Sequence, residues 1–177
     1  MYYVIQVKTG KEEQTMEDIR HLGKDDPYFD VFSPYKEVYR KYGGERRKVK
    51  ERCFPGYLFV ETNDVDRLFR ELYELEAFTR LLGREGKTNH FAPLLEKEER
   101  MINILYGREQ DRTSKILDIE VLKEGDRVRV LDGPLMDMEF PVKKVDLHRR
   151  RILLDLSLAG RDTKVEVGIN IVMKVDG

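Results

Sequence analysis

Residues 54–60, Phe-Pro-Gly-Tyr-Leu-Phe-Val, place the strongest local constraint on the fold. Phe54 precedes a proline and is therefore pushed out of helical geometry. Pro55 and Gly56 suit the two central positions of a type II turn, where glycine supplies the positive φ. Residues 57–60 are strand-favouring and consecutively apolar, which predicts a short buried strand. Such a turn most often only starts a strand, but here it also forms a corner on which we expect part of the Phe54 ring to be exposed.

A strongly basic segment leads into this corner. Residues 36–52 contain eight basic and three acidic residues, with Gly43 and Gly44 near the middle as a hairpin signal. The sequences on both sides are too polar for central strands, so we expect a two-stranded basic arm. An arm of this kind usually serves as a solvated edge that discourages aggregation. Its functional interpretation is contact with a polyanion.

Apolar spacing predicts the other elements of the first half. A buried strand at residues 2–7 is followed by a helix that opens with a Thr9–Glu12 capping box and stops at Gly23. A strand at 28–42, interrupted at Ser33-Pro34, leads into the arm. After the buried strand at residues 57–60 we expect a helix behind Asn63-Asp64, a strand at 77–82, and a helix between Pro93 and Gly107. The order β-α-β-β-β-α-β-α predicts an α/β sandwich over residues 1–106.

The character of the sequence changes after residue 106. Residues 107–118 are polar and aperiodic, which indicates a linker, and helical spacing is lost in residues 119–177. Short alternating segments predict five strands, at residues 126–131, 140–146, 151–158, 163–167 and 169–175. A small domain of five short strands favours a β-barrel, which closes its own sheet edges. We expect these strands both in the isolated second domain and in the full-length chain.

The two halves together resemble the NusG family of transcription factors. The first half is similar to the NusG N-terminal domain in four motifs: Tyr3-Val4-Ile5, Thr9-Gly10, the Gly43-Gly44 arm with Arg46-Arg47-Lys48, and Phe54-Pro55-Gly56-Tyr57. The second half resembles a KOW domain in residues 124–130, 132–134, 160–163 and 165–167. The resemblance implies an α+β protein: an antiparallel sheet flanked by helices, followed by a five-stranded KOW β-barrel.

The resemblance also implies a partner and a contact surface. NusG-family proteins bind RNA polymerase at the clamp helices of its largest subunit through an apolar patch of the first domain. Phe54 matches an aromatic residue of that patch, and Tyr3 and Cys53 lie near it in the motif. These three are the expected polymerase-binding residues.

Two departures from the family pattern point to a specialised member. General NusG carries an aromatic residue just before the Gly-Arg of its last KOW loop, where it helps contact the ribosomal protein NusE, but this chain has Ala159 there. The usual KOW glycine near the second strand is replaced around Phe140-Pro141. We therefore expect a specialised paralogue, of the kind that includes RfaH and the LoaP group. Contact with the ribosome or with Rho is not implied.

A basic cluster in the second half is the candidate RNA-binding site. Between Lys143 and Arg151 five full positive charges face one negative charge, Asp146. Phosphate contacts and arginine stacking on bases would give such a cluster affinity for RNA. The alternative is a charged hairpin that only keeps a small barrel soluble. The expected RNA-binding residues are Lys143, Lys144, His148, Arg149, Arg150 and Arg151, joined by Arg161 and Lys164.

Other function classes find little support. With 33 Lys and Arg against 34 Asp and Glu, any affinity for nucleic acid must come from local clustering. Cys53 is the single cysteine, so an intramolecular disulfide is excluded, and the three histidines have no metal-ligand spacing. We expect no enzyme activity, no cofactor, no signal peptide and no membrane span, and a monomeric cytoplasmic protein.

Three functions remain open at this point. The first is a specialised antiterminator that binds polymerase and is recruited by nascent RNA, most simply a hairpin, or by exposed DNA of the transcription bubble. The second is a general NusG that couples polymerase to the ribosome or Rho. The third is an RNA- or ribosome-associated KOW protein without polymerase contact.

Overall fold

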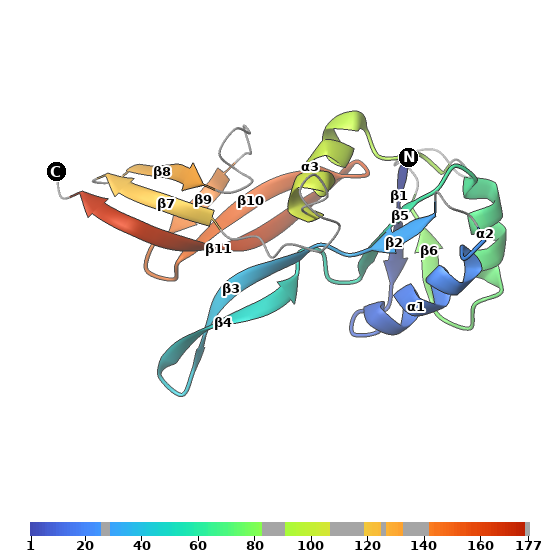
Figure 1. The fold of residues 1–177 in the computed structure, drawn as a ribbon, viewed down its shortest axis with the longest axis horizontal. Helices are drawn as coiled ribbons and strands as arrows, with labels where there is room; N and C mark the ends of the chain where they lie inside the picture. The colour runs from blue at the N-terminus through green and yellow to red at the C-terminus, as the bar shows by residue number, and fades with distance from the viewer. Residues whose placement is uncertain (26–28, 83–90, 107–118, 125–126, 133–141, 176–177) are drawn as a thin grey trace. The chain divides into compact units, whose positions relative to one another are not determined.

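A computed structural model describes residues 1–25, 29–82, 91–106, 119–124, 127–132 and 142–175 of the protein (Figure 1). By its contacts the chain divides into two compact units. Unit 1 comprises residues 1–33, 54–101 and 158–161, and unit 2 comprises residues 34–53, 102–157 and 162–177. The expected linker at 107–118 lies outside the described residues. None of the helices in the described ranges is both long and apolar enough to cross a membrane.

Unit 1 is built on a four-stranded antiparallel sheet with the strand order β2-β5-β1-β6. The register pairs Tyr3 with Val60 and Val4 with Phe59. This confirms the antiparallel sheet expected for the first half. The strands are β1 (Tyr2–Val7), β2 (Asp30–Phe32), β5 (Tyr57–Glu61) and β6 (Thr79–Leu81).

Two helices, α1 (Glu12–Leu22) and α2 (Val65–Tyr73), bury one face of this sheet. Side chains of a strand alternate between the two faces, so Tyr3, Ile5 and Val7 all point to the same side. They form one apolar cluster with Met16 and Ile19 of α1 and Leu68 and Leu72 of α2. The amphipathic spacing in the sequence therefore identified the core of this layer.

The opposite face of the sheet carries a row of aromatic rings. Phe32 and Phe59 stack at 5.7 Å between ring centroids, with Tyr2 edge-on to Phe32 at 5.4 Å. Phe54 meets Phe59 edge-on at 5.3 Å, a favoured geometry for aromatic pairs. Only 1% of Phe54 is exposed, so the expectation of a partly exposed ring is wrong. The turn directs the ring onto Phe59 instead of into solvent.

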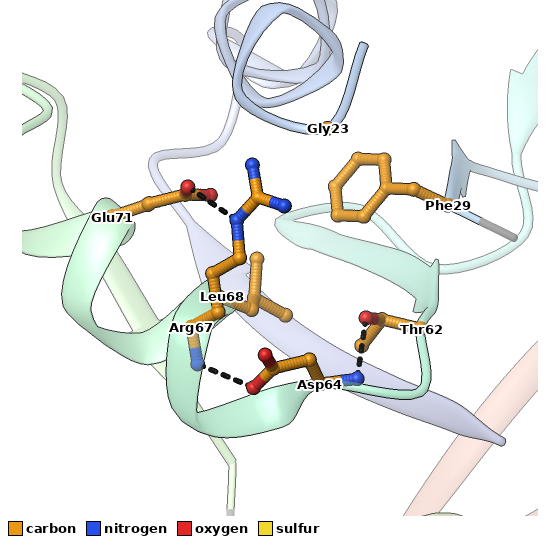
Figure 2. A pocket seen from close by; sticks show the side chains of 7 residues that line it. All are labelled: Gly23, Phe29, Thr62, Asp64, Arg67, Leu68 and Glu71. Carbon is orange, nitrogen blue, oxygen red and sulfur yellow. Dashed lines mark hydrogen bonds and ion pairs between the residues drawn. The ribbon is translucent and has the colours of Figure 1, made fainter. Parts of the chain in front are cut away.

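The helix ends mostly follow the sequence signals. Helix α2 is capped by Asp64, whose side chain accepts a hydrogen bond from the Arg67 N–H at 2.9 Å (Figure 2). In helix α3 (Glu96–Tyr106) the Glu98 carboxylate accepts a hydrogen bond from the Leu95 N–H at 2.7 Å. Helix α1 stops at Gly23, as expected. No side chain caps its start, so the predicted Thr9–Glu12 capping box is wrong.

The basic arm of unit 2 forms as a separate two-stranded ribbon (Figure 1). Strands β3 (Tyr35–Tyr42) and β4 (Glu45–Arg52) pair along their whole length. Gly43 and Gly44 join them with φ of 56° and 94°, the paired positive values that a type I′ hairpin turn requires. The Ser33-Pro34 break leaves β2 and β3 in different sheets, so the first half contains one strand more than predicted.

The second half forms a five-stranded sheet with the order β8-β7-β11-β10-β9. Closing a barrel would require the edge strands β8 and β9 to pair, and the described strands form an open sheet instead. The predicted closed barrel is therefore not confirmed. The strands are β7 (Ile119–Glu124), β8 (Arg127–Asp132), β9 (Val142–Asp146), β10 (Arg151–Leu158) and β11 (Arg161–Val175).

Two details of this sheet differ from the prediction. Strand β7 has no counterpart among the expected segments, and it pairs in parallel with the far half of β11. The segments predicted as separate strands around Gly168 form one continuous β11. Gly168 is needed for a close approach and not for a turn, because a Cβ there would lie 2.5 Å from the Glu37 carbonyl oxygen of the arm. The β conformation expected for the full-length chain is confirmed over β9, β10 and β11.

Candidate polymerase and RNA interfaces

The Phe54 corner is a type II turn held from two sides. The Tyr57 N–H donates to the Phe54 carbonyl at 3.2 Å, and Gly56 has a φ of 80°, as the sequence predicts. The Gly56 carbonyl accepts from the Val7 N–H at 2.8 Å, which ties the turn to the end of β1. A Cβ on Gly56 would lie 2.9 Å from the Thr9 hydroxyl, so the turn has no room for a side chain.

The second attachment of this corner comes from Glu12, at the start of α1. One carboxylate oxygen accepts from the Gly56 N–H at 2.9 Å, and the other accepts from the Gly10 N–H at 2.7 Å. Glu12 is 5% exposed; its charge-assisted bond to Gly56 is buried, and the one to Gly10 is partly buried. Two motifs that are 44 residues apart in sequence therefore form one unit. The sequence signal was present in Glu12, but its short spacing to Thr9 indicated a helix cap.

The three expected polymerase-binding residues do not share one surface. Tyr3 pairs with Val60 and points toward α1 and α2, whereas Phe54 packs on Phe59 on the other face of the sheet. Cys53 is 2% exposed, and its N–H donates to the Pro34 carbonyl at 2.8 Å. Burial raises the pKa of the Cys53 thiol to about 12, against the opposing charge of Lys36. All three residues are buried, so none offers a ready contact surface.

The expected RNA-binding cluster centres on the turn between β9 and β10. Asp146 organises it: the carboxylate accepts from the Arg149 N–H at 2.9 Å, and the Arg150 N–H donates to the Leu147 carbonyl at 3.3 Å. That backbone bond from Arg149, aided by the charges of Arg151 and Arg149, lowers the pKa of Asp146. Arg150 itself has a φ of 52°, a left-handed conformation uncommon outside glycine and asparagine. The turn therefore has a defined shape.

One arginine of the cluster is engaged by acidic side chains. Arg151 forms ion pairs with Glu166 of β11 and, at 3.5 Å, with Asp146. Glu166 also binds Arg40 of the arm at 2.8 Å, and Arg40 contacts Glu51 across the arm at 2.7 Å. The hydrogen bond from Arg40 lowers the pKa of Glu51. The charge of Arg151 is therefore balanced within the protein.

The other members of the cluster remain accessible to different degrees. Lys144, His148 and Arg149 are exposed, and 67% of the Arg149 side chain is accessible although it lies 3.9 Å from Asp146. Arg150 is exposed as well, and its guanidinium lies 5.5 Å from the centre of the Tyr39 ring of the arm, a cation–π distance. The side chain of Lys143 lies outside the described part of the structure.

Arg161 and Lys164 do not join this turn. The β10–β11 hairpin has a two-residue connection at Ala159 and Gly160, both with positive φ. Arg161 therefore begins β11 at the far end of β10, roughly 20 Å from Arg151 at about 3.3 Å per strand residue. Lys164 is exposed part of the way along β11. The structure thus brings together the 144–151 residues of the expected cluster and leaves these two apart from them.

A hollow between α1 and α2 offers no competing site (Figure 2). Arg67 occupies it, donating to Glu71 at 2.7 Å and to the Leu22 carbonyl at 3.3 Å, so its guanidinium joins the two helices. The Asp64 N–H donates a hydrogen bond to the Thr62 hydroxyl at 3.0 Å, and both residues line the hollow. The described residues contain no group of three or more His, Cys, Asp or Glu side chains that could hold a metal ion.

Comparison with known proteins identifies a family. The profile of the family described as "Transcription termination factor nusG" matches residues 1–103. The chain is 29% identical to the transcription termination/antitermination protein NusG of Buchnera aphidicola and to that of Escherichia coli K12, in each case over 98% of this chain and 95% of the relative. A crystal structure of an Spt4:Spt5 complex covers 95% of this chain and 92% of its own at 17% identity and a TM-score of 0.29. Because the family profile matches more than half of the chain, the chain belongs to the NusG family.

Proposed function

We propose that the protein is a specialised processive antiterminator of the NusG family, acting in the cytoplasm. Its first half binds RNA polymerase at the clamp helices of the largest subunit, and its second half binds nascent RNA. The polymerase contact rests on the family and on the aromatic face around Phe54. Because Phe54 is buried, this face must become exposed before polymerase can bind it.

The observation that carries the RNA-binding proposal is the hydrogen-bonded, exposed turn between β9 and β10. Asp146 holds the backbone of the turn through the Arg149 N–H, while 67% of the Arg149 side chain stays exposed. A positive group on a preorganised loop can bind phosphate without a large ordering cost. Arg151 is paired internally and serves to position the turn.

The experiment titrates the full-length protein with leader RNAs of candidate operons at several salt concentrations. Arg149→Gln should weaken binding roughly fivefold near physiological salt and lower the salt slope by about one unit or slightly less, because one phosphate contact is lost. The control is Arg100→Gln on α3, which removes an equally exposed arginine and leaves binding unchanged. Leader RNAs that bind no better than scrambled RNA would refute RNA as the recruitment signal and favour DNA of the transcription bubble.

Polymerase binding is tested separately by co-purification with core RNA polymerase and with ribosomes. We expect polymerase to be retained and ribosomes to be lost, because Ala159 replaces the aromatic residue of the NusE contact. Retention of ribosomes without polymerase would establish instead a ribosome-associated KOW protein.

A general NusG role is the second candidate. It is favoured by the relatives, which are named as termination/antitermination NusG proteins and match over nearly their whole length. The two candidates differ in the number of operons on which the protein acts, since a general factor would associate with most transcribed operons. Chromatin immunoprecipitation that finds the protein on most operons would support general NusG, and occupancy of a few would support the specialised role.

A further inference from the structure

The arm and the β9–β10 turn are in direct contact within unit 2. Glu166 of β11 binds Arg40 of β3 at 2.8 Å and also binds Arg151 at the start of β10. The Arg150 guanidinium lies over the Tyr39 ring at 5.5 Å. Two segments more than 100 residues apart in sequence are therefore connected by an ion network and a cation–π contact.

The basic residues around this contact divide into two groups. Arg40 and Arg151 are bound to carboxylates and hold the segments together. The second group is more exposed, although each member also has a carboxylate nearby. Arg47 lies directly across the arm from Arg40 and pairs with Glu45 at 3.1 Å, with 68% of its side chain accessible. Arg149 lies 3.9 Å from Asp146, with 67% accessible, and precedes Arg150, which contacts the arm. The exposed positive charges of both segments thus flank the same contact.

The tip of the arm adds an aromatic ring to these charges. Tyr42 is 56% exposed, whereas most large apolar side chains of the described residues are buried. By the register and the alternation of strand side chains, Tyr42 shares a face of the arm with exposed Arg47, whereas exposed Lys41 and Arg46 lie on the opposite face. An exposed aromatic ring beside cations is the combination on which unpaired bases stack, and a continuous duplex offers no free base face.

We propose that the arm and the β9–β10 turn form one binding surface for a folded RNA, the arm–turn surface, made of Tyr42, Arg47, His148 and Arg149. Its cations bind the phosphates of an RNA hairpin, and Tyr42 stacks on an unpaired base of the loop. This inference rests on the RNA binding proposed above and extends it to the arm, which belongs to the other half of the sequence. The ion network through Glu166 positions the two segments.

The test uses fluorescence anisotropy with the full-length protein and three probes of one sequence: a 12-base-pair RNA hairpin with a four-nucleotide loop, the same stem as a blunt RNA duplex, and the DNA hairpin. We expect Arg47→Gln and Arg149→Gln each to weaken RNA-hairpin binding roughly fivefold and to lower the salt slope by about one unit or less. Arg100→Gln, which removes an arginine of similar exposure that is also paired with a glutamate, should have no effect. Tyr42→Ala should weaken the RNA hairpin and leave the blunt duplex unchanged.

The variants separate this inference from the function on which it rests. If Arg149→Gln weakens binding while Arg47→Gln and Tyr42→Ala behave like the control, the arm is not part of the surface and RNA binding by the turn stands. If Arg149→Gln also behaves like the control, the proposed RNA-binding function itself fails. A DNA hairpin that binds as tightly as the RNA hairpin would overturn the assignment of RNA as the ligand. Circular dichroism spectra of the variants establish that each is folded.

Discussion

At the scale of single residues, Glu12 has a larger structural role than its position suggests. Its buried carboxylate accepts the N–H groups of Gly10 and Gly56, at 2.7 and 2.9 Å. It thereby attaches the Pro55-Gly56 turn to the start of α1. The turn after Phe54 consequently depends on a carboxylate from the first helix.

Replacing this carboxylate should be costly. We expect Glu12→Ala to lower the free energy of unfolding by about 2–4 kcal/mol, because two backbone N–H groups lose a charged acceptor and one of them is buried. Urea denaturation followed by circular dichroism measures the change. The control is Glu17→Ala on the same helix, where an exposed pair with Arg20 is removed and a loss of under about 1 kcal/mol is expected. Equal losses for the two variants would contradict the role given to Glu12.

Cys53 reports whether the chain next to Phe54 opens. Burial raises the pKa of its thiol to about 12, so at pH 8 the folded protein holds almost no thiolate, the form that reacts with disulfide reagents. We expect labelling by such a reagent to be slower than in urea by orders of magnitude and to proceed through opening of the structure. If polymerase binding exposes Cys53 before the complex covers it, adding core polymerase should accelerate the labelling. Rapid labelling of the free folded protein at pH 8 would show that the site is open.

At the scale of elements, the arm depends on a tertiary contact. Arg40 and Glu166 have 37% and 19% of their side chains exposed, so their attraction is only partly screened by water. A double-mutant cycle of Arg40→Ala and Glu166→Ala should give a coupling of about 0.5–1 kcal/mol. The same cycle on Glu45 and Arg47, which are 74% and 68% exposed, should give a coupling near zero. Equal couplings would mean that the network does not hold the arm.

At the scale of the whole molecule, the two compact units interleave along the chain. The arm lies in the first half of the sequence, yet it belongs by its contacts to unit 2. Val38 of the arm is 1% exposed, and the Glu37 carbonyl lies close enough to Gly168 to exclude a Cβ there. A fragment that ends before β7 therefore lacks the partners of its own arm.

Hydrogen exchange should reveal this dependence. In a fragment of residues 1–106, we expect peptides that cover β3 to exchange faster than in the full-length protein, because their contacts with β11 are gone. Peptides that cover β1 and β5 serve as the internal control and should keep their protection, since their sheet is complete within unit 1. Unchanged exchange in β3 would show that the arm is ordered by itself.

The sequence by itself determined the features that are specified locally. Pro55 and Gly56 gave the type II turn, Gly43 and Gly44 gave the hairpin, and Asp64 gave the start of α2, because each depends on φ preferences or on a hydrogen bond that spans a few residues. Strand alternation and helical spacing likewise indicated which faces are apolar. The family motifs in the first half were recognisable for the same reason.

Only the tertiary structure decided which distant groups meet. The acceptor role of Glu12 toward Gly56, the burial of Phe54 on Phe59 and the pairing of Arg151 with Glu166 all join residues that no local pattern links. In the sequence the arginines of the turn are equivalent positive charges. In the structure Arg151 is paired with Glu166, whereas most of the Arg149 side chain is exposed. The physical reason is that the effect of a buried ring or a charge depends on its neighbours in space, and for these residues the neighbours come from strands far away in the sequence.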